Sequence, residues 1–348
     1  MKKNRNLIFL VILLGGLTAY FTVQHGNSTV REELKDFAVK DTAAITKIFL
    51  ADRSNHAVTI EKKNGRWLVN DKYKPRKDVL KDLMDVLYLV DVRTKVSKAA
   101  YNNVIKNLAA ASVKCEIYLN GETKPFKTYY VGGQTEDALG TFMMLDQSSV
   151  PFITQIPGFN GYLTPRYCVS EDIWRENSLF TYKPGEIKKI SVDYANFPQK
   201  SFAIEINNGI KTVTTPDEKN SLSQADTTAI NNYVELFSGV YYEAIERTLS
   251  KFSIDSIINL PPPISIRIED QNKKESEVRI YPMPLSHASL SKIDSTGAPL
   301  KYDVDRMYGY SLPSKEMLIL QHYNFDRVLR QLDDFRIKSN GKAAPRRK

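Results

Sequence analysis

The sequence predicts an α+β protein with an N-terminal transmembrane helix and two related modules, each a mainly antiparallel sheet with helices. Three observations support this fold class: an uncharged apolar run near the start, a pattern that occurs twice along the chain, and strands that outnumber the helices. Because helices do not alternate one-for-one with strands, antiparallel sheets are favoured over a doubly wound parallel sheet. The length of 348 residues suits about two domains.

The expected organisation follows from shifts in composition along the chain. It comprises a basic cytoplasmic end at 1–6, a signal anchor at 7–23, a polar stalk at 24–42, a first module at 43–182, a second module at 183–335 and a basic disordered tail at 336–348. The segment Tyr182-Lys183-Pro184-Gly185 is the expected seam between the modules.

The apolar run at 7–23 contains no charged residue. As a helix it is about 26 Å long, slightly short of a hydrocarbon core of about 30 Å. A cleaved signal peptide is the alternative, but it needs a small-x-small cleavage site that this run fits poorly. Lys2, Lys3 and Arg5 precede the run, so the positive-inside rule places the N-terminus in the cytoplasm. We therefore expect a single-pass inner-membrane protein with the bulk of the chain in the periplasm.

The net charge of +9 comes from the two ends of the chain, so residues 6–335 are neutral overall. A groove for nucleic acid would leave a surplus of positive charge on the body, and we expect no nucleic-acid partner. Cys115 and Cys168 are able to form a disulfide in the periplasm. Cys115 alternates with Val113 and Ile117, however, which is typical of a buried strand residue. The two cysteines and four scattered histidines have no zinc-site spacing, so we expect no metal or cofactor.

The repeat begins with a strand and a hairpin. AITKIFL at 44–50 returns as EIKKISV at 186–192, and VTIEKKNG at 58–65 returns as FAIEINNG at 202–209. Asn-Gly tolerates the positive φ angles of a type I′ turn, so both copies predict a hairpin.

A helix follows each hairpin. Leu80, Leu83, Met84 and Leu87 recur at i, i+3, i+4 and i+7, and the second copy reads Ile230, Tyr233, Val234 and Phe237. This spacing forms one apolar helix face. Ser223 and Asp226 resemble a capping box at the start of the second helix, and Pro75 suits the first turn of the first helix.

The remainder of each module is predicted as strands and one final helix. Strands at 113–119 and 127–133 correspond to strands at 264–270 and 278–283. A strand pair at 141–145 and 150–156 then corresponds to a pair at 301–305 and 308–312. The final helices are expected at 170–180, capped by Ser170, and at 324–335, capped by Asn324. Pro261-Pro262-Pro263 is expected to be a stiff connector.

Several segments also resemble one known family. They are REELKDFAVKDTAAITKIFLAD (31–52), NGRWLVN (64–70), YYVGGQTEDALGTFMML (129–145), PGFNGYLTPRY (157–167) and DIW (172–174). Residues 31–180, and more weakly the second half, resemble the bacterial envelope family called domain of unknown function 4340, in its Bacteroidota form. The resemblance implies a single-pass envelope protein with no established activity. Some members resemble partners of gliding-type ABC transport systems, so it also implies ABC transporter subunits as partners.

Catalytic motifs are missing from the sequence, which contains no GxSxG, HExxH, P-loop or GxGxxG pattern. His287 has a serine neighbourhood, Ser286 and Ser289, but a base also needs an orienting carboxylate. Asp303 and Asp305 lie two apart and on a strand would share one face, where they could bind a cation or transfer protons. The simpler interpretation is a loop histidine and the solvated face of a strand.

Two glycine-containing loops are the candidate binding regions. The first, at 131–142, combines flexible backbone with polar side chains, and its candidate residues are Gly132, Gly133, Gln134, Glu136, Asp137 and Gly140. The second, at 157–167, carries Phe159, Tyr162 and Tyr167, which suit contact with a protein or glycan if exposed. A plain turn and burial against Trp174 are the respective alternatives.

The sequence thus predicts a non-catalytic, membrane-anchored envelope protein that binds a partner as a scaffold or accessory subunit. The alternatives are an envelope hydrolase with a dispersed site, for which His287, Asp303 and Asp305 are the candidates, and a small-ligand or glycan receptor that uses the two loops.

Overall fold

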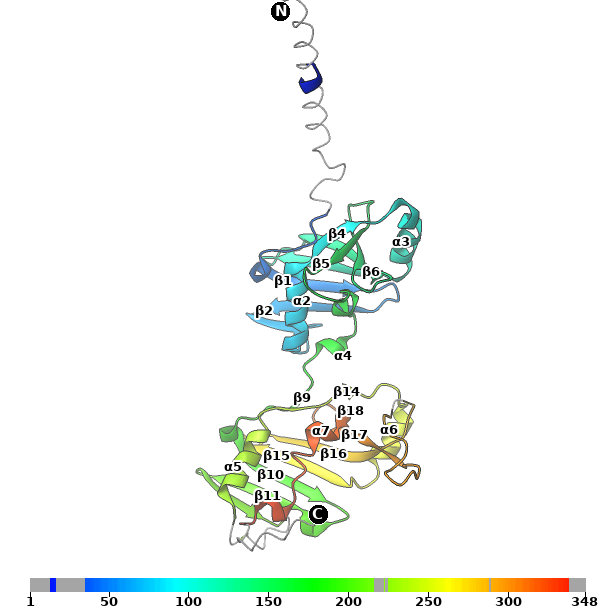
Figure 1. Ribbon diagram of the computed structural model, residues 1–348. Helices are drawn as coiled ribbons and strands as arrows, with labels where there is room; N and C mark the ends of the chain where they lie inside the picture. The colour runs from blue at the N-terminus through cyan, green and yellow to red at the C-terminus, as the bar shows by residue number, and fades with distance from the viewer. Residues whose placement is uncertain (1–12, 17–34, 216–221, 223–224, 288, 338–348) are drawn as a thin grey trace, which may run out of the picture. The chain divides into compact units, whose positions relative to one another are not determined.

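The computed structural model describes residues 13–16, 35–215, 222, 225–287 and 289–337 (Figure 1). The chain divides into two compact units, Met1–Glu176 and Asn177–Lys348, and each unit is considered by itself. Of the expected anchor at 7–23, only residues 13–16 are described, and they are helical. None of the helices in the described part of the chain is long and apolar enough to span a membrane.

The first unit contains an eight-stranded sheet in which all neighbours are antiparallel. Its order is β3 (Arg66–Val69), β2 (Ala57–Lys63), β1 (Ile45–Ala51), β5 (Val113–Leu119), β6 (Lys127–Gln134), β7 (Thr141–Leu145), β8 (Phe152–Gln155) and β4 (Asp91–Lys95).

The second unit has an eight-stranded antiparallel sheet with a corresponding order. It runs β12 (Ile210–Thr214), β11 (Phe202–Asn207), β10 (Ile187–Tyr194), β15 (Ile264–Asp270), β16 (Glu275–Pro284), β17 (Tyr302–Ser311), β18 (Glu316–Gln321) and β14 (Ala244–Ile245). A separate pair joins β9 (Ser178–Phe180) to β13 (Val240–Tyr241). The predicted α+β class with antiparallel sheets is confirmed. The two sheets have the same order of strands, which is what a repeated module would produce.

The helices of the first unit are α2 (Lys77–Leu89), α3 (Lys98–Ala111), α4 (Glu171–Trp174), η2 (Thr42–Ala44) and η3 (Thr164–Tyr167). The second has α5 (Thr227–Leu236), α6 (Lys251–Ile258), α7 (His322–Phe325), η4 (Pro184–Glu186), η5 (Pro198–Lys200) and η6 (Leu332–Phe335). Helices α2 and α3 of the first unit occupy the same places in the order of elements as α5 and α6 of the second, whereas η5 has no counterpart.

Both predicted hairpins are confirmed. Asn64 and Gly65 have φ angles of 51° and 77°, and Asn208 and Gly209 have φ angles of 51° and 82°. Positive φ at both central residues is the requirement of a type I′ turn, which matches the right-handed twist of the strands it joins.

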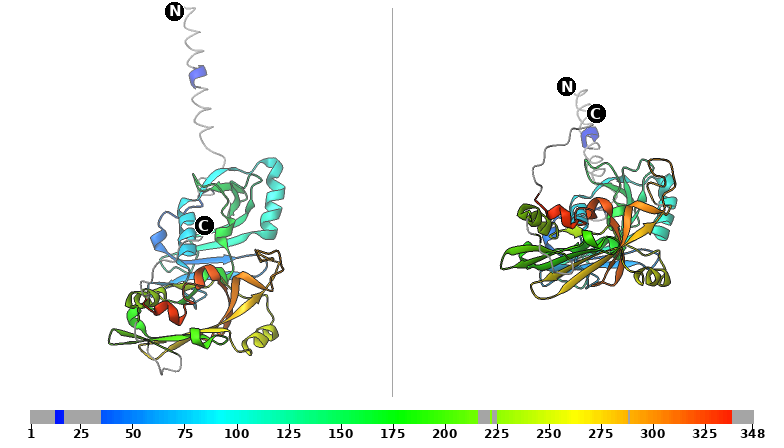
Figure 2. Two further views of the ribbon diagram at one scale, coloured as in Figure 1. Left: turned by 60° about the horizontal axis from the view of Figure 1, so that its bottom comes forward. Right: turned by 90° about the horizontal axis from the view of Figure 1, so that it is seen from below.

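Each sheet is covered on both faces, but by different helices. The buried residues of α2 pack on one face of the first sheet, and those of α5 do so on the second. On the opposite face, α3 packs over Phe142, Met144 and Ile153, and α6 packs over Tyr281, Tyr308 and Met317. Figure 2 shows α6 on the other side of the second sheet from α5 and α7. The apolar stripe predicted for α2 and α5 is therefore the core-facing stripe.

The stalk predicted at 24–42 ends earlier than expected. Residues 24–34 lie outside the described residues, but Phe37, Ala38 and Val39 are buried in the first core. The Phe37 ring makes edge-on contacts with Tyr129 and Phe152, at centroid distances of 5.9 and 6.1 Å. Because charged residues flank these three apolar residues on both sides, the sequence pattern did not indicate that they belong to the core.

The strand pair predicted at 301–305 and 308–312 is wrong. Residues 302–311 form one strand, β17, which pairs with β16 and β18. The chain reverses after Ser311 instead, where Lys315 adopts a positive φ of 56°.

Three helix starts also differ from prediction. The N-cap of α5 is Asp226, whose side chain accepts hydrogen bonds from the N–H groups of Thr228 and Ala229, whereas Ser223 lies outside the described residues. The N-cap of α2 is Arg76, so Pro75 precedes the helix. Asn324 lies inside α7, whose N-cap is Gln321.

The two final helices are shorter than predicted. Ser170 is the N-cap of α4, but its side chain makes no capping hydrogen bond and the helix ends at Trp174. The rest of the segment 170–180 includes β9. Because β9 pairs with β13 and Phe180 packs in the second core, the units divide after Glu176 and not at the expected seam.

Candidate functional site

The candidate site lies in the second unit, where β17 begins. β16 and β17 pair at Pro282 with Met307 and at Pro284 with Tyr302, so β17 has extra residues between these two pairs. Such a bulge leaves backbone groups unpaired and redirects side chains. It contains Asp303 and Asp305, the two carboxylates that the sequence had suggested.

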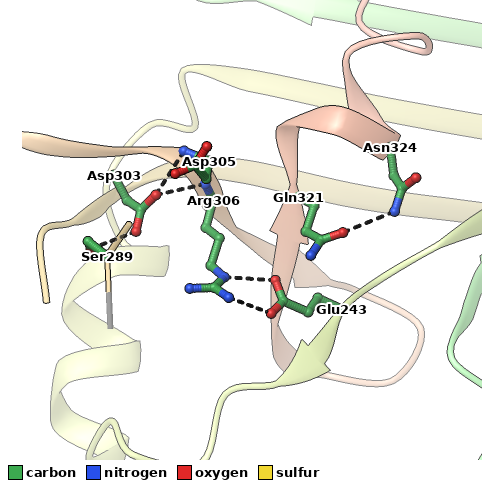
Figure 3. A network of polar contacts seen from close by, with 7 residues as sticks. All are labelled: Glu243, Ser289, Asp303, Asp305, Arg306, Gln321 and Asn324. Atoms are coloured by element: carbon green, nitrogen blue, oxygen red, sulfur yellow. Dashed lines mark hydrogen bonds and ion pairs between the residues drawn. The ribbon is translucent and has the colours of Figure 1, made fainter. Parts of the chain in front are cut away.

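Asp303 holds this bulge together. Its side chain is almost fully buried, and Oδ1 accepts hydrogen bonds from the backbone N–H groups of Asp305 at 2.8 Å and Arg306 at 3.0 Å. The Ser289 hydroxyl donates to Oδ2 at 2.6 Å (Figure 3). Burial raises the pKa of Asp303, but these three hydrogen bonds outweigh it and hold the pKa below its ordinary value. The carboxylate is therefore ionised and already bound by neighbouring groups.

Asp305 is joined to Asp303 through its backbone N–H group. The bulge breaks the alternation of strand side chains on which the expected shared face depended. Oδ2 of Asp305 is buried without a hydrogen-bond partner among the described residues. Both carboxylate oxygens of Asp303 are already engaged, by the bulge and by Ser289, and nowhere in the described chain do three His, Cys, Asp or Glu residues gather as a metal site would require.

Arg306 ties the bulge to the far edge of the sheet. Its Nε and Nη2 atoms donate to the two carboxylate oxygens of Glu243, each at 2.8 Å. Glu243 immediately precedes β14, so this bidentate pair joins the edge strand to β17. The hydrogen bonds to Glu243 raise the pKa of Arg306. Such a forked pair fixes geometry as well as charge.

A hollow of about 300 Å³ opens beside this network. It is lined by Leu290, Asp305, Arg306, Gln321, His322 and Tyr323. The Tyr323 side chain is 91% exposed and Leu290 is 80% exposed. Two polar side chains of the hollow are tied to neighbours: His322 Nδ1 lies 2.9 Å from Asp326 Oδ1, and Asn324 donates to Gln321 at 3.2 Å. The hollow therefore combines a fixed polar floor with an apolar rim.

His287 is exposed, and it is not part of this network. A serine nucleophile needs a base that takes its proton, whereas the Ser289 hydroxyl donates to the carboxylate of Asp303. The structure brings Ser289 and Asp303 together, and their hydrogen bond joins the chain before β17 to the bulge.

The glycine loop at 131–142 is a closed turn. Gly132 is part of β6, and a Cβ there would lie 2.7 Å from Leu108 Cδ2 of α3. A Cβ at Gly140 would lie 2.5 Å from Ile153 Cγ2. A larger residue at either position would therefore have to displace a neighbouring side chain. Gly133, Gln134 and Glu136 are exposed.

Asp137 organises the turn. It accepts hydrogen bonds from the Thr135 hydroxyl at 2.5 Å and the Leu139 N–H at 3.0 Å, and Arg93 of β4 lies 3.1 Å away. The same groups, Thr135 foremost, lower the pKa of Asp137 to about 2. The turn is thus tied to the edge strand β4 by an ion pair. In this unit the arginine is on the edge strand, whereas in the second unit Glu243, immediately before the edge strand β14, provides the carboxylate.

The loop at 157–167 divides into exposed and buried parts. Phe159 and Tyr162 are exposed, as partner contact would require. Tyr167 is fully buried, and its hydroxyl lies 3.1 Å from that of Tyr129 in the core. Tyr167 is therefore a core residue and the prediction that it contacts a partner is wrong. Arg166 lies over the Phe159 ring at 5.3 Å and pairs with Asp82 at 2.9 Å.

Sequence reasoning missed the hollow itself. Tyr323 and His322 sit in the segment LQHYNFDR, where an aromatic residue among polar residues was the one available signal. Glu243 gave no signal, because its partner Arg306 is 63 positions away.

Both cysteines are free, and the Cys115 thiol is buried in β5, which raises its pKa to about 12.

Comparison of the chain with protein families, curated proteins and solved structures gave no match.

Proposed function

We propose that this protein is a non-catalytic, membrane-anchored envelope protein that binds a partner protein through the hollow beside β17. The observation that carries the proposal is that the hollow combines polar side chains held in place with apolar side chains that are exposed. Arg306, Gln321 and His322 are each held by a neighbouring side chain, whereas Tyr323 and Leu290 are largely exposed to solvent. Exposed apolar side chains beside a fixed polar surface are typical of interaction sites.

The energetics also favour binding over chemistry. Tyrosine is enriched among the residues that contribute most to interfaces, because it covers a large area and orders few rotatable bonds. Burying Tyr323 on a partner would desolvate a ring that is now almost fully exposed. Asp303 and Arg306, by contrast, are held by hydrogen bonds that a catalytic role would have to break.

The cellular setting of the proposal comes from the sequence. The apolar run at 7–23 is the membrane anchor, and the basic residues before it place the remainder in the periplasm. The like strand order of the two sheets supports an internal duplication, in which the second unit has acquired the docking hollow. The resemblance stated above makes subunits of a gliding-type ABC transport system the first partners to test.

Site-specific photocrosslinking in native membranes tests the proposal. The photoreactive residue p-benzoylphenylalanine replaces Tyr323 in one strain and Phe197 in a control strain. Phe197 is 51% exposed and follows β10 in the same unit, outside the hollow. We expect a single predominant crosslink to a permease or ATPase subunit from position 323 and none from position 197.

Equal labelling from both positions, or none from position 323 in membranes where the protein is functional, would refute docking at the hollow. A crosslink from position 323 to an envelope protein unrelated to transport would retain the binding role and reject the transporter as partner.

A further inference from the structure

The chain joins the first unit through a clamped segment. Lys127 is nearly buried, and its Nζ donates to the backbone oxygens of Asp36 at 2.8 Å and Ala38 at 2.6 Å. Its third contact is Asp36 Oδ2 at 3.1 Å. The Val39 N–H donates to Leu87 O at 2.7 Å, and Phe37 is buried beneath. The point where the chain leaves for residue 34 is therefore fixed on the surface of this unit.

The surface on both sides of this point is hollowed. Asp36 lines a hollow of about 360 Å³ with Pro125 and Phe126. It also lines a second hollow, of about 650 Å³, with Lys35, Lys40 and Leu89. Because one residue belongs to both hollows, the β5–β6 connection and the end of α2 flank the same stretch of chain.

The side chains around this point are of a distinctive kind. Phe126 is 56% exposed and Leu89 is 44% exposed, with Tyr88 beside it also exposed. Lysine ammonium groups lie next to the rings: Lys40 Nζ is 5.0 Å from the Tyr88 ring centroid, and Lys127 Nζ is 5.6 Å from that of Phe126. We call Lys35, Lys40, Tyr88, Leu89 and Phe126 the proximal surface.

We propose that the proximal surface rests in the interfacial layer of the bilayer that holds the anchor, so that the first unit touches the membrane at a second place. Aromatic side chains partition to this layer, and lysine stems lie along apolar surface while their ammonium groups reach the lipid headgroups. The inference rests on the anchor in the proposed function, but not on the docking hollow.

The length of the connecting chain favours the bilayer as the occupant of this surface. Residues 24–34 alone separate the apolar run from Lys35. Even when fully extended they reach at most about 40 Å. Because Lys127 fixes the point of departure, the side of the unit held closest to the membrane is the proximal surface.

Fluorescence of the full-length protein in vesicles of phosphatidylethanolamine and phosphatidylglycerol tests this inference. Leu89→Cys and Phe126→Cys each carry an environment-sensitive nitrobenzoxadiazole dye in a Cys168→Ser background, where Cys115 is buried and does not react. The control is Ile173→Cys. Ile173 is 45% exposed, like Leu89, but lies beside the first turn of α2, where Arg76 N–H donates to Trp174 O. The two ends of this helix are about 20 Å apart.

We expect the emission at positions 89 and 126 to shift to shorter wavelength, and lipids with a nitroxide on the headgroup to quench it. The dye at position 173 should keep the emission of dye in water. Failure of either position 89 or position 126 to be quenched more than position 173 would overturn the inference. Alkaline extraction of the same vesicles tests the anchor separately. Release of the protein would overturn anchor and proximal surface together, whereas retained protein with unquenched dyes would overturn the surface alone.

Discussion

Replacement of Asp303 provides the sharpest test of its structural role. In Asp303→Ala, the backbone N–H groups of Asp305 and Arg306 and the Ser289 hydroxyl all lose their acceptor. A hydrogen bond to a charged group contributes about 1.5–3 kcal/mol, and an unsatisfied buried donor costs about 1–3 kcal/mol. Because water reaches part of the bulge once the side chain is gone, we expect a loss of about 2–4 kcal/mol in the free energy of unfolding of the second unit. Asp303→Asn keeps an acceptor oxygen for the bulge and should lose about 1 kcal/mol.

Urea unfolding of the solubilised protein measures this loss. With a slope of about 2 kcal/mol per molar urea, the alanine variant should shift the midpoint of the second unit by roughly 1–2 M. Both tryptophans, Trp67 and Trp174, lie in the first unit, so far-ultraviolet circular dichroism should register the shift while tryptophan fluorescence reports the first unit. His287→Ala, at an exposed position, is the control and should leave both signals unchanged.

The pH dependence has a defined sign. Because the folded pKa of Asp303 lies below its ordinary value of 3.8, the stability from the carboxylate is complete above that pH and is lost as the pH falls through the folded pKa. The difference between the wild-type protein and Asp303→Asn should therefore shrink below pH 3.8. An alanine variant with wild-type stability at pH 7 would refute a structural role and return Asp303 to the catalytic candidates.

Three further predictions concern the first unit. Gly140→Ala should destabilise it by about 1–3 kcal/mol through overpacking against Ile153, whereas Gly133→Ala, with open space around its Cβ, should change stability by less than about 0.5 kcal/mol; thermal melts followed by tryptophan fluorescence compare the two. Asp137→Asn should speed hydrogen exchange of the Leu139 amide, and in the wild-type protein this protection should decline only as the pH falls from 3.8 towards about 2, because the pKa of Asp137 is lowered. Unchanged exchange in the variant would show that other contacts hold the turn. Lys127→Met removes the clamp on residues 36–38 and should raise the rate of tryptic cleavage after Lys40 by roughly tenfold, for a loss of about 1.4 kcal/mol. Lys124→Met, at an exposed position, should leave that rate unchanged, and equal rates in both variants would contradict the clamp.

The parts of the fold that sequence predicted are those whose signal is local. The Asn-Gly turns need particular backbone angles, and α2 and α5 carry a full apolar stripe, so both were visible. Helix α3 was missed because only Val104 and Leu108 of its residues are buried, and α6 was missed because it has no buried residue. More of the apolar residues in these two contacts belong to the sheet strands than to the helices, so neither helix has a clear apolar stripe in its sequence.

The candidate site was less predictable because its geometry is not local. Asp303 and Asp305 were identified, but their relation depends on a bulge whose cause, the pairing of Pro284 with Tyr302, involves a distant strand. The exposure of Tyr323 cannot be inferred from its neighbours in sequence. Tyr167 shows the converse error, because a tyrosine in a glycine-rich loop proved to be buried against Tyr129.

The connection between β6 and β7 and the corresponding one between β16 and β17 differ in length, and this has a consequence for how the two units diverge in sequence. Residues 135–140 join β6 to β7, whereas the corresponding residues 285–301, almost three times as many, join β16 to β17. Loop closure entropy grows only with the logarithm of length, so the longer connection costs about 1 kcal/mol more. New sequence can therefore accumulate in this connection while the pairing farther along both strands is kept, from Val278 with Ser311 to Pro282 with Met307 in the second unit.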